Sequence, residues 1–317
     1  MATKEQSSLP ETMQAVVVPH FGGPEVLRLE ERPLPEMKHD DVLIRVRAIG
    51  VNPVDHKTRS GQGMASKMGD PPFIVGWDVA GEVVDRGRRV TEFEEGDRVA
   101  GMVNFPAPGG GYAEFVRADA RELVGIPQGV SFQAAAGLPL AGLTAYQALF
   151  DVAKLRIRNR LLIHGAAGGV GHLAVQLARE AGCEIIGSAS PRNRQYLEAI
   201  GVDEVIDYHD AKWEAAVDFV DAVLDPIGGE TRERSLSVLA RHGVLVALTS
   251  DARNVSSQRV KWMLVKPQPR QLAELMAKLG DGTIRVTTTS VPGLAGISQA
   301  HVMSQSGHVR GKVVVEL

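Results

Sequence analysis

One glycine-rich stretch constrains the fold of this chain more than any other part of it. Residues 160–179 read RLLIHGAAGGVGHLAVQLAR. An apolar run at residues 161–163 leads into the glycines, and apolar residues then recur at helical spacing from Val170 to Ala178. This order predicts a strand, a tight turn and a helix, the unit from which parallel α/β sheets are built.

The turn has the spacing of a dinucleotide-binding fingerprint, with Ala166, Gly168 and Gly171 at its key positions. Gly168 would let the backbone approach a pyrophosphate, and Gly171 would let the helix pack closely on the strand. Gly169 and Val170 lie where the helix begins, and N–H groups at a helix start bind phosphates. An ordinary strand-to-helix turn is the alternative, but the flanking strand and helix favour nucleotide binding.

Composition excludes several other classes of protein. The 317 residues carry a formal net charge of −3, which favours neither nucleic acid nor an acidic membrane as a partner. The single cysteine, Cys183, excludes an intrachain disulfide and a cysteine-rich zinc site, and it fits a reducing, cytoplasmic setting. Residues 1–12 are interpreted as a loose tail without a signal-peptide core. The longest apolar stretch, residues 134–150, is interrupted by polar residues and predicts a buried segment.

The sequence pattern changes between residues 125 and 133. Before this point, strand-like segments separated by Gly/Asp turns predict a compact, barrel-like β domain. After it, strands alternate with helices, and this alternation predicts an α/β fold with a doubly wound parallel sheet. The last strand, residues 312–317, fits neither pattern clearly.

The tip of the second strand of this sheet indicates the cofactor. An acidic residue about 20 residues beyond the glycine turn would bind the ribose 2′-hydroxyl of NAD. Residues 188–194 read SASPRNR, without a carboxylate, and Ser190 stands beside two arginines. Arg192 or Arg194 could bind a 2′-phosphate, so NADPH is the predicted cofactor, unless both arginines merely form a solvated helix start. Tyr208, after the third strand, could cover the adenosine or simply pack.

An ordered series of stretches resembles the zinc-free quinone oxidoreductase and alkenal/enone reductase branch of the medium-chain dehydrogenase/reductase superfamily. The stretches are FGGPEVL (21–27), AIGVNPVDHKTRSG (48–61), GWDVAGEVV (76–84), GDRVAG (96–101), GLTAYQAL (142–149), HGAAGGVG (164–171) and SGHVRGKVVVEL (306–317). The resemblance covers essentially the whole chain. It implies a GroES-like catalytic domain at residues 1–125, a Rossmann NADPH-binding domain at 126–258, and a return to the catalytic domain at 259–317.

The resemblance also permits a check for zinc. Zinc-dependent relatives hold the catalytic metal with two cysteines and a histidine, and the corresponding positions here are Asn52, Trp77 and Leu140. None of these is a credible tetrahedral zinc ligand. A short loop at residues 107–111 replaces the cysteine lobe that binds structural zinc. No metal is therefore predicted, and stoichiometric zinc in the purified protein would favour a zinc-dependent alcohol dehydrogenase instead.

Without a Lewis acid, reduction of an enone, enal or quinone suits the site better than alcohol oxidation, because an enolate needs only hydrogen-bond donors or a cation. By resemblance, Asn52 lies near the nicotinamide, and Lys57 binds the substrate carbonyl or the cofactor ribose. A solvated surface lysine is the alternative for Lys57. Asp55 could pair with Lys57, contact the cofactor or stabilise the turn. One-electron quinone reduction and a catalytically weak NADPH-binding regulatory or structural protein are the competing functions.

The resemblance implies further cofactor contacts. Thr144 would approach the nicotinamide, although a helix-capping threonine is the alternative. Leu248 would contact the carboxamide through its backbone at the carboxyl edge of the sheet. Arg310 and Gly311 belong to a tail that folds toward the cofactor in relatives, although an exposed turn would have the same sequence. Asp225 is interpreted as structural.

Two features concern the substrate and the assembly. The polar loop at residues 251–268 is expected to encode substrate choice. Dimers are frequent in the family, and an edge strand near residues 244–248 could support a homodimer.

Overall fold

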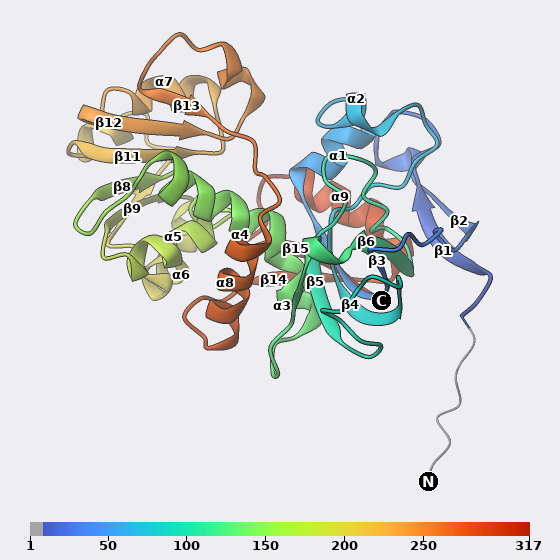
Figure 1. The fold of residues 1–317 in the computed structure, drawn as a ribbon. Helices are drawn as coiled ribbons and strands as arrows, with labels where there is room; N and C mark the ends of the chain where they lie inside the picture. The colour runs from blue at the N-terminus through green and yellow to red at the C-terminus, as the bar shows by residue number, and fades with distance from the viewer. Residues whose placement is uncertain (1–8) are drawn as a thin grey trace.

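The molecule has two lobes, and each contains one main sheet (Figure 1). One sheet is parallel and the other is largely antiparallel. The computed structural model describes residues 9–317. Residues 1–8 of the predicted N-terminal tail lie outside the described residues, and Thr12 begins the first strand of the described range. Within the described range, no helix has both the length and the apolar character needed to cross a membrane.

The first lobe holds a six-stranded parallel sheet. Its strands, in spatial order, are β10 (Glu204–Asp207), β9 (Glu184–Ala189), β8 (Arg160–Ile163), β11 (Val220–Asp225), β12 (Leu239–Ala247) and β13 (Val260–Trp262). The surrounding helices include α5 (Gly171–Glu180), α6 (Arg194–Ile200) and α7 (Gly229–Ser235). The central strands are apolar almost throughout because both faces of the sheet are covered. The predicted doubly wound sheet is confirmed, and its order reverses at β8, where such sheets bind ligands.

The second lobe is largely antiparallel. Its path runs β14 (Thr288–Pro292), β15 (Lys312–Glu316), β3 (Asp41–Val51), β4 (Asp78–Arg86), β5 (Arg98–Met102) and β7 (Leu123–Gly125), with β6 (Phe115–Asp119) also paired to β3. A separate hairpin joins β1 (Thr12–Val17) to β2 (Arg28–Pro33). The helices here are α1 (Pro53–Arg59), α2 (Ala65–Met68) and α9 (Ile297–Gln305). The last strand of the chain thus pairs with β3 of the N-terminal part.

Three helices lie between the lobes in Figure 1: α3 (Phe132–Gly137), α4 (Pro139–Tyr146) and α8 (Pro269–Gly280). A short π-helical segment, residues 147–152, continues α4. Helix α3 packs against β3 and β4, although it follows the boundary predicted at residue 126. The six-stranded sheet likewise extends to Trp262, past the boundary predicted at residue 258. One continuous core joins residues of both lobes, including Ile49 and Leu173, so packing fixes their relative position.

The predicted edge strand is wrong. Strand β12 pairs with β13 in parallel along residues 245–247, so the stretch near 244–248 is covered by another strand. The edge strands of this sheet, within the described residues, are β10 and the three-residue strand β13.

Candidate active site and cofactor-binding region

The glycine turn between β8 and α5 depends on glycine at two positions. Gly165 has a φ of +57°, in the left-handed region. A Cβ atom on Gly171 would lie 2.3 Å from the carbonyl oxygen of Gly165 and 2.8 Å from the Cα of Ala166. Gly168, Gly169 and Val170 remain half-buried beside this close contact. The turn therefore keeps part of its backbone accessible while α5 packs directly on the strand end.

His172 connects this turn to Thr287 through hydrogen bonds. Its Nδ1 donates to the carbonyl oxygen of Gly168 at 2.9 Å, and its Nε2 accepts from the N–H of Thr287 at 3.3 Å. This tautomer requires a neutral ring, and burial lowers the pKa of His172 to about 4.

A small pocket of about 80 Å³ lies at the carboxyl edge of the sheet next to the turn. Among its lining residues are Gly168, Ser190, Arg192 and Tyr208, together with residues 307–309 of the C-terminal tail. The structure thus brings four predicted cofactor-binding residues together.

Arg194, in contrast, does not line this pocket. Its guanidinium donates to the carbonyl oxygen of Val205, a residue of β10, at 3.0 Å. The two arginines therefore lie in different environments, although a single residue separates them.

The C-terminal tail, residues 307–312, contacts the glycine turn and the segment at residues 193–196. The N–H of Gly311 donates to the carbonyl oxygen of Ala167 at 2.9 Å, and Gly311 has a φ of +66°. Arg310 donates through Nε to Asn193 at 3.0 Å and lies over the ring of Tyr196, 4.7 Å from its centroid. The Arg310 guanidinium is thus engaged within the protein, where it holds the segment that carries Arg192.

Asn52 lies at the start of α1 and is 1% exposed. Its Nδ2 donates to Asp78 at 2.9 Å, and its backbone N–H donates to Asp55 at 2.6 Å. Its Oδ1 accepts from the ammonium of Lys312. A carboxylate on one side and an ammonium on the other fix the orientation of this amide.

The two carboxyl groups around Asn52 are fully buried. Desolvation raises the pKa of Asp55 to about 7 and that of Asp78 to about 6. Asp55 also accepts from the hydroxyl of Tyr112 at 3.0 Å, and Asp78 accepts from the N–H of Leu140 at 3.0 Å. Asp55 therefore caps α1 instead of pairing with Lys57.

The remaining predicted residues lie in dissimilar environments. Lys57 is exposed on α1, and its ammonium makes no hydrogen bond or ion pair within residues 9–317. Thr144 is buried inside α4 and donates to the carbonyl oxygen of Leu140 at 2.6 Å, so the helix-capping alternative is wrong. Leu248 follows β12 and donates through its N–H to the backbone carbonyl oxygen of Asp225 at 2.9 Å. The Asp225 carboxylate accepts from the N–H groups of residues 227 and 228, each at 2.9 Å, in a structural turn.

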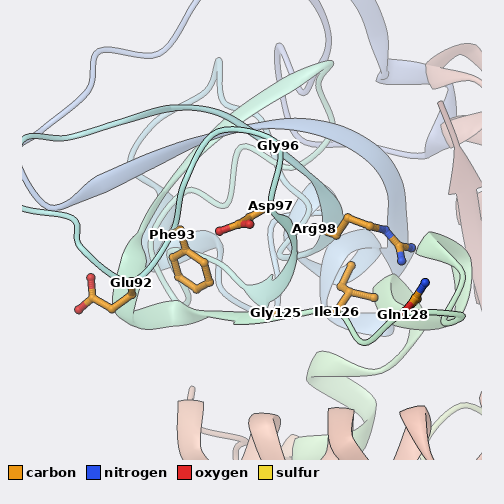
Figure 2. Close-up of a pocket in the computed structure, with 8 residues that line it drawn as sticks. All are labelled: Glu92, Phe93, Gly96, Asp97, Arg98, Gly125, Ile126 and Gln128. Atoms are coloured by element: carbon orange, nitrogen blue, oxygen red, sulfur yellow. The ribbon is translucent and has the colours of Figure 1, made fainter.

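A larger pocket of about 480 Å³ lies elsewhere, on the second lobe (Figure 2). It is lined by residues from 92–98 and 125–128, next to β5 and β7. None of the predicted site residues belongs to it. Size alone therefore does not identify the functional site.

Two of the three positions that correspond to zinc ligands carry side chains that do not suit zinc. Trp77 is buried and donates its indole N–H to Ala107 at 2.8 Å, and Leu140 has no donor atom in its side chain. Among the residues that the structure describes, His, Cys, Asp and Glu side chains form no group of three suited to a metal ion.

His164, the residue between β8 and Gly165, provides a test of the packing beneath the turn. Its ring is buried, with hydrogen bonds to Ser188 at 2.8 Å and to Ser235 at 2.7 Å. Burial lowers its pKa to about 4 from the ordinary 6.5. Between these values the unfolded chain binds a proton that the folded chain does not, so the free energy of unfolding falls as the pH falls.

We expect His164→Gln to remove this proton from the unfolding equilibrium. The slope of unfolding free energy against pH, measured by urea denaturation at about pH 4.5 to 6, should decrease by about 1.4 kcal/mol per pH unit. The raised pKa values of Asp55 and Asp78 act in the opposite sense, so variants are compared with wild type. His242→Gln, at an exposed position, should leave the slope unchanged. An unchanged slope for His164→Gln would contradict the lowered pKa of His164.

Comparisons with known proteins agree with this architecture. Residues 38–128 match the alcohol dehydrogenase GroES-like domain, and residues 200–315 match the model described as zinc-binding dehydrogenase. The fold and the site thus define a two-domain, nicotinamide-dependent oxidoreductase of the medium-chain type.

Individual relatives narrow this class. A chloroplast envelope quinone oxidoreductase homolog of Arabidopsis thaliana is 31% identical over 314 residues, covering 93% of this chain and 95% of the relative. An NADPH-dependent alkenal/one oxidoreductase of the same plant is 36% identical over 251 residues, covering 77% and 64%. The solved quinone oxidoreductase of Coxiella burnetii superimposes with a TM-score of 0.92 at 36% identity, covering 96% and 99%. The chain belongs to the quinone oxidoreductase and alkenal/enone reductase branch of the medium-chain dehydrogenase/reductase superfamily, as its sequence motifs predicted.

Proposed function

We propose that this protein is a zinc-independent, NADPH-dependent reductase that transfers hydride to an α,β-unsaturated carbonyl compound or a quinone. One observation carries the proposal: the tail at residues 307–312 contacts the pocket beside the glycine turn at one end and Asn52 at the other. A dinucleotide needs a site for its phosphates and a site for its nicotinamide, and this tail connects candidates for both.

The residues of the first site fit a dinucleotide phosphate. The close contact at Gly171 leaves no room for a Cβ, and the half-buried Gly168 lines the pocket. Ser190 and Arg192 offer a hydroxyl and a guanidinium to a 2′-phosphate, and the pocket lining includes no carboxylate. The relative named as an NADPH-dependent alkenal/one oxidoreductase supports the same cofactor.

At the second site, NADPH when bound supplies the hydride, and the residues of this chain position the reacting groups. Asn52 presents an amide of fixed orientation next to the predicted nicotinamide position. Lys57 projects an exposed ammonium from the same helix, where it would stabilise negative charge that develops on a substrate oxygen. Thr144, Leu248 and Gly311 complete the predicted cofactor contacts.

The cytoplasmic setting and a homodimer are further parts of this proposal. The buried thiol of Cys183 suits a reducing compartment. The short strand β13 offers an edge on which a second copy could pair, and the mass of the purified protein in solution tests this assembly.

Oxidation of NADPH, with NADH in parallel, tests the proposed reaction against enones, enals, quinones and simple ketones in the presence of a metal chelator. We expect chelator-resistant turnover, preference for NADPH, and a saturated carbonyl product from enones. Reduction of quinones alone with detectable semiquinone would favour the one-electron reaction. Tight NADPH binding without turnover would favour a regulatory protein, and chelator-sensitive turnover of simple ketones would favour a zinc-dependent dehydrogenase.

A further inference from the structure

Lys312 is a buried cation that touches both lobes of the molecule. It begins β15 and is 3% exposed. Its aliphatic chain lies against the glycine turn, because a Cβ atom on Gly169 would stand 3.1 Å from the Cδ of Lys312. Its ammonium donates to the carbonyl oxygen of Val51 at 3.1 Å and to Oδ1 of Asn52. One side chain thus connects the phosphate-binding turn with the amide at the other end of the site.

The surrounding charges explain why an ammonium is stable there. Asp55 and Asp78 are both fully buried, and each is attracted to Lys312. Burial disfavours all three charges, since it raises the pKa of both carboxyls and lowers the pKa of the lysine. The buried cation therefore offsets carboxylate charge that no solvent reaches.

The same contacts decide which way the Asn52 amide points. An asparagine side chain has a donor end and an acceptor end of similar shape. The donor end faces Asp78, and the acceptor end faces Lys312. Without the ammonium, Oδ1 of Asn52 would have no donor from Lys312, and the carbonyl oxygen of Val51 would lose one hydrogen bond.

We propose that Lys312 is a positioning residue that holds the Asn52 amide in one orientation and couples it to the glycine turn. This inference rests on the proposed function, because it requires Asn52 to border the bound cofactor. Its signature is energetic coupling: Lys312 contributes to cofactor binding and turnover through Asn52, so its contribution disappears when the Asn52 amide is absent.

A double-mutant cycle on the full chain tests this coupling, with Lys312→Met, Asn52→Ala and the double variant. Lys312→Met keeps the length of the aliphatic chain and removes the ammonium. We expect it to raise the Kd for NADPH, measured by fluorescence titration, about tenfold and to lower kcat/KM about tenfold or more. In the Asn52→Ala background the same substitution should change either quantity by less than about threefold.

Two further variants separate positioning from packing. The exposed Lys38→Met makes the same chemical change on the surface and should leave both quantities unchanged. Lys312→Arg keeps the cation and its donors and should restore most of the lost binding. If Lys312→Met does not fold, the same cycle is measured with Lys312→Arg. The smaller loss of NADPH binding caused by Lys312→Arg must then disappear in the Asn52→Ala background.

Losses that add independently in the double variant would overturn the inference, as would wild-type binding by Lys312→Met. A Lys312→Arg variant as impaired as Lys312→Met would also overturn it, because packing would then matter more than the ammonium. Failure of the proposed function gives a different result. If the wild type reduces no substrate, the cycle is still read from the Kd for NADPH, and coupling there supports the positioning role alone.

Discussion

Gly171→Ala is expected to raise the Kd for NADPH at least about 100-fold. The added Cβ would stand 2.3 Å from the carbonyl oxygen of Gly165, a distance that no relaxation of side chains can relieve, because both neighbours are backbone. Either α5 or the turn must move, and both form the predicted phosphate site. A loss of this size corresponds to about 2.7 kcal/mol, within the range for overpacking a close contact. Fluorescence titration with NADPH measures it.

Gly125→Ala is the matched control. Its Cβ would meet no atom within 4 Å, and Gly125 lies at the end of β7 in the other lobe. We expect wild-type binding and an unchanged melting temperature. Circular dichroism on both variants shows whether the fold is retained. A folded Gly171→Ala variant that binds NADPH as the wild type does would place the phosphate site elsewhere.

Arg192→Gln is expected to reduce the preference for NADPH over NADH by about 10- to 100-fold. A guanidinium on a phosphate forms a charge-assisted hydrogen bond, and such bonds contribute about 1.5 to 3 kcal/mol. Arg192 lines the pocket with Ser190 and Tyr208. Because NADH lacks the 2′-phosphate, its kcat/KM should change little. Parallel measurement of kcat/KM for both cofactors gives the ratio.

Arg194→Gln makes the same change two residues further on. Its guanidinium bonds to Val205 and lies outside the pocket lining, so we expect the cofactor preference to stay within about threefold of wild type. Equal effects of the two substitutions would mean that general positive charge, rather than one guanidinium, selects the cofactor. A normal preference in Arg192→Gln would assign the 2′-phosphate to other residues.

The sequence predicted the parts of the fold that depend on local spacing. The unit from β8 through the glycine turn to α5 is contiguous, and its apolar period and glycines are visible within residues 160–179. The alternation of strands and helices likewise indicated the parallel sheet. The boundaries were less predictable, because α3 packs on β3 and β13 extends the other sheet through contacts that no local pattern encodes.

The candidate site was predicted in part for the same reason. The motif at residues 48–61 predicted Asn52 as a site residue, but its partner Lys312 is 260 positions away in the sequence. A lysine that opens an apolar strand has the same sequence pattern whether it is buried or solvated. Arg192 and Arg194 could not be distinguished from the sequence. Both are arginines, two positions apart, but the fold gives them different hydrogen-bond partners.

The contact of the C-terminal tail with both lobes has a consequence for the order of folding during synthesis. Strand β15 pairs with β3, and residues 307–309 line the pocket beside the glycine turn. A growing chain that has not yet reached these residues lacks one wall of the pocket and the Lys312 contact to Asn52. Contacts of such high sequence separation form late and slowly. The candidate cofactor site therefore depends on the pairing of β15 with β3, two strands that lie far apart in the sequence.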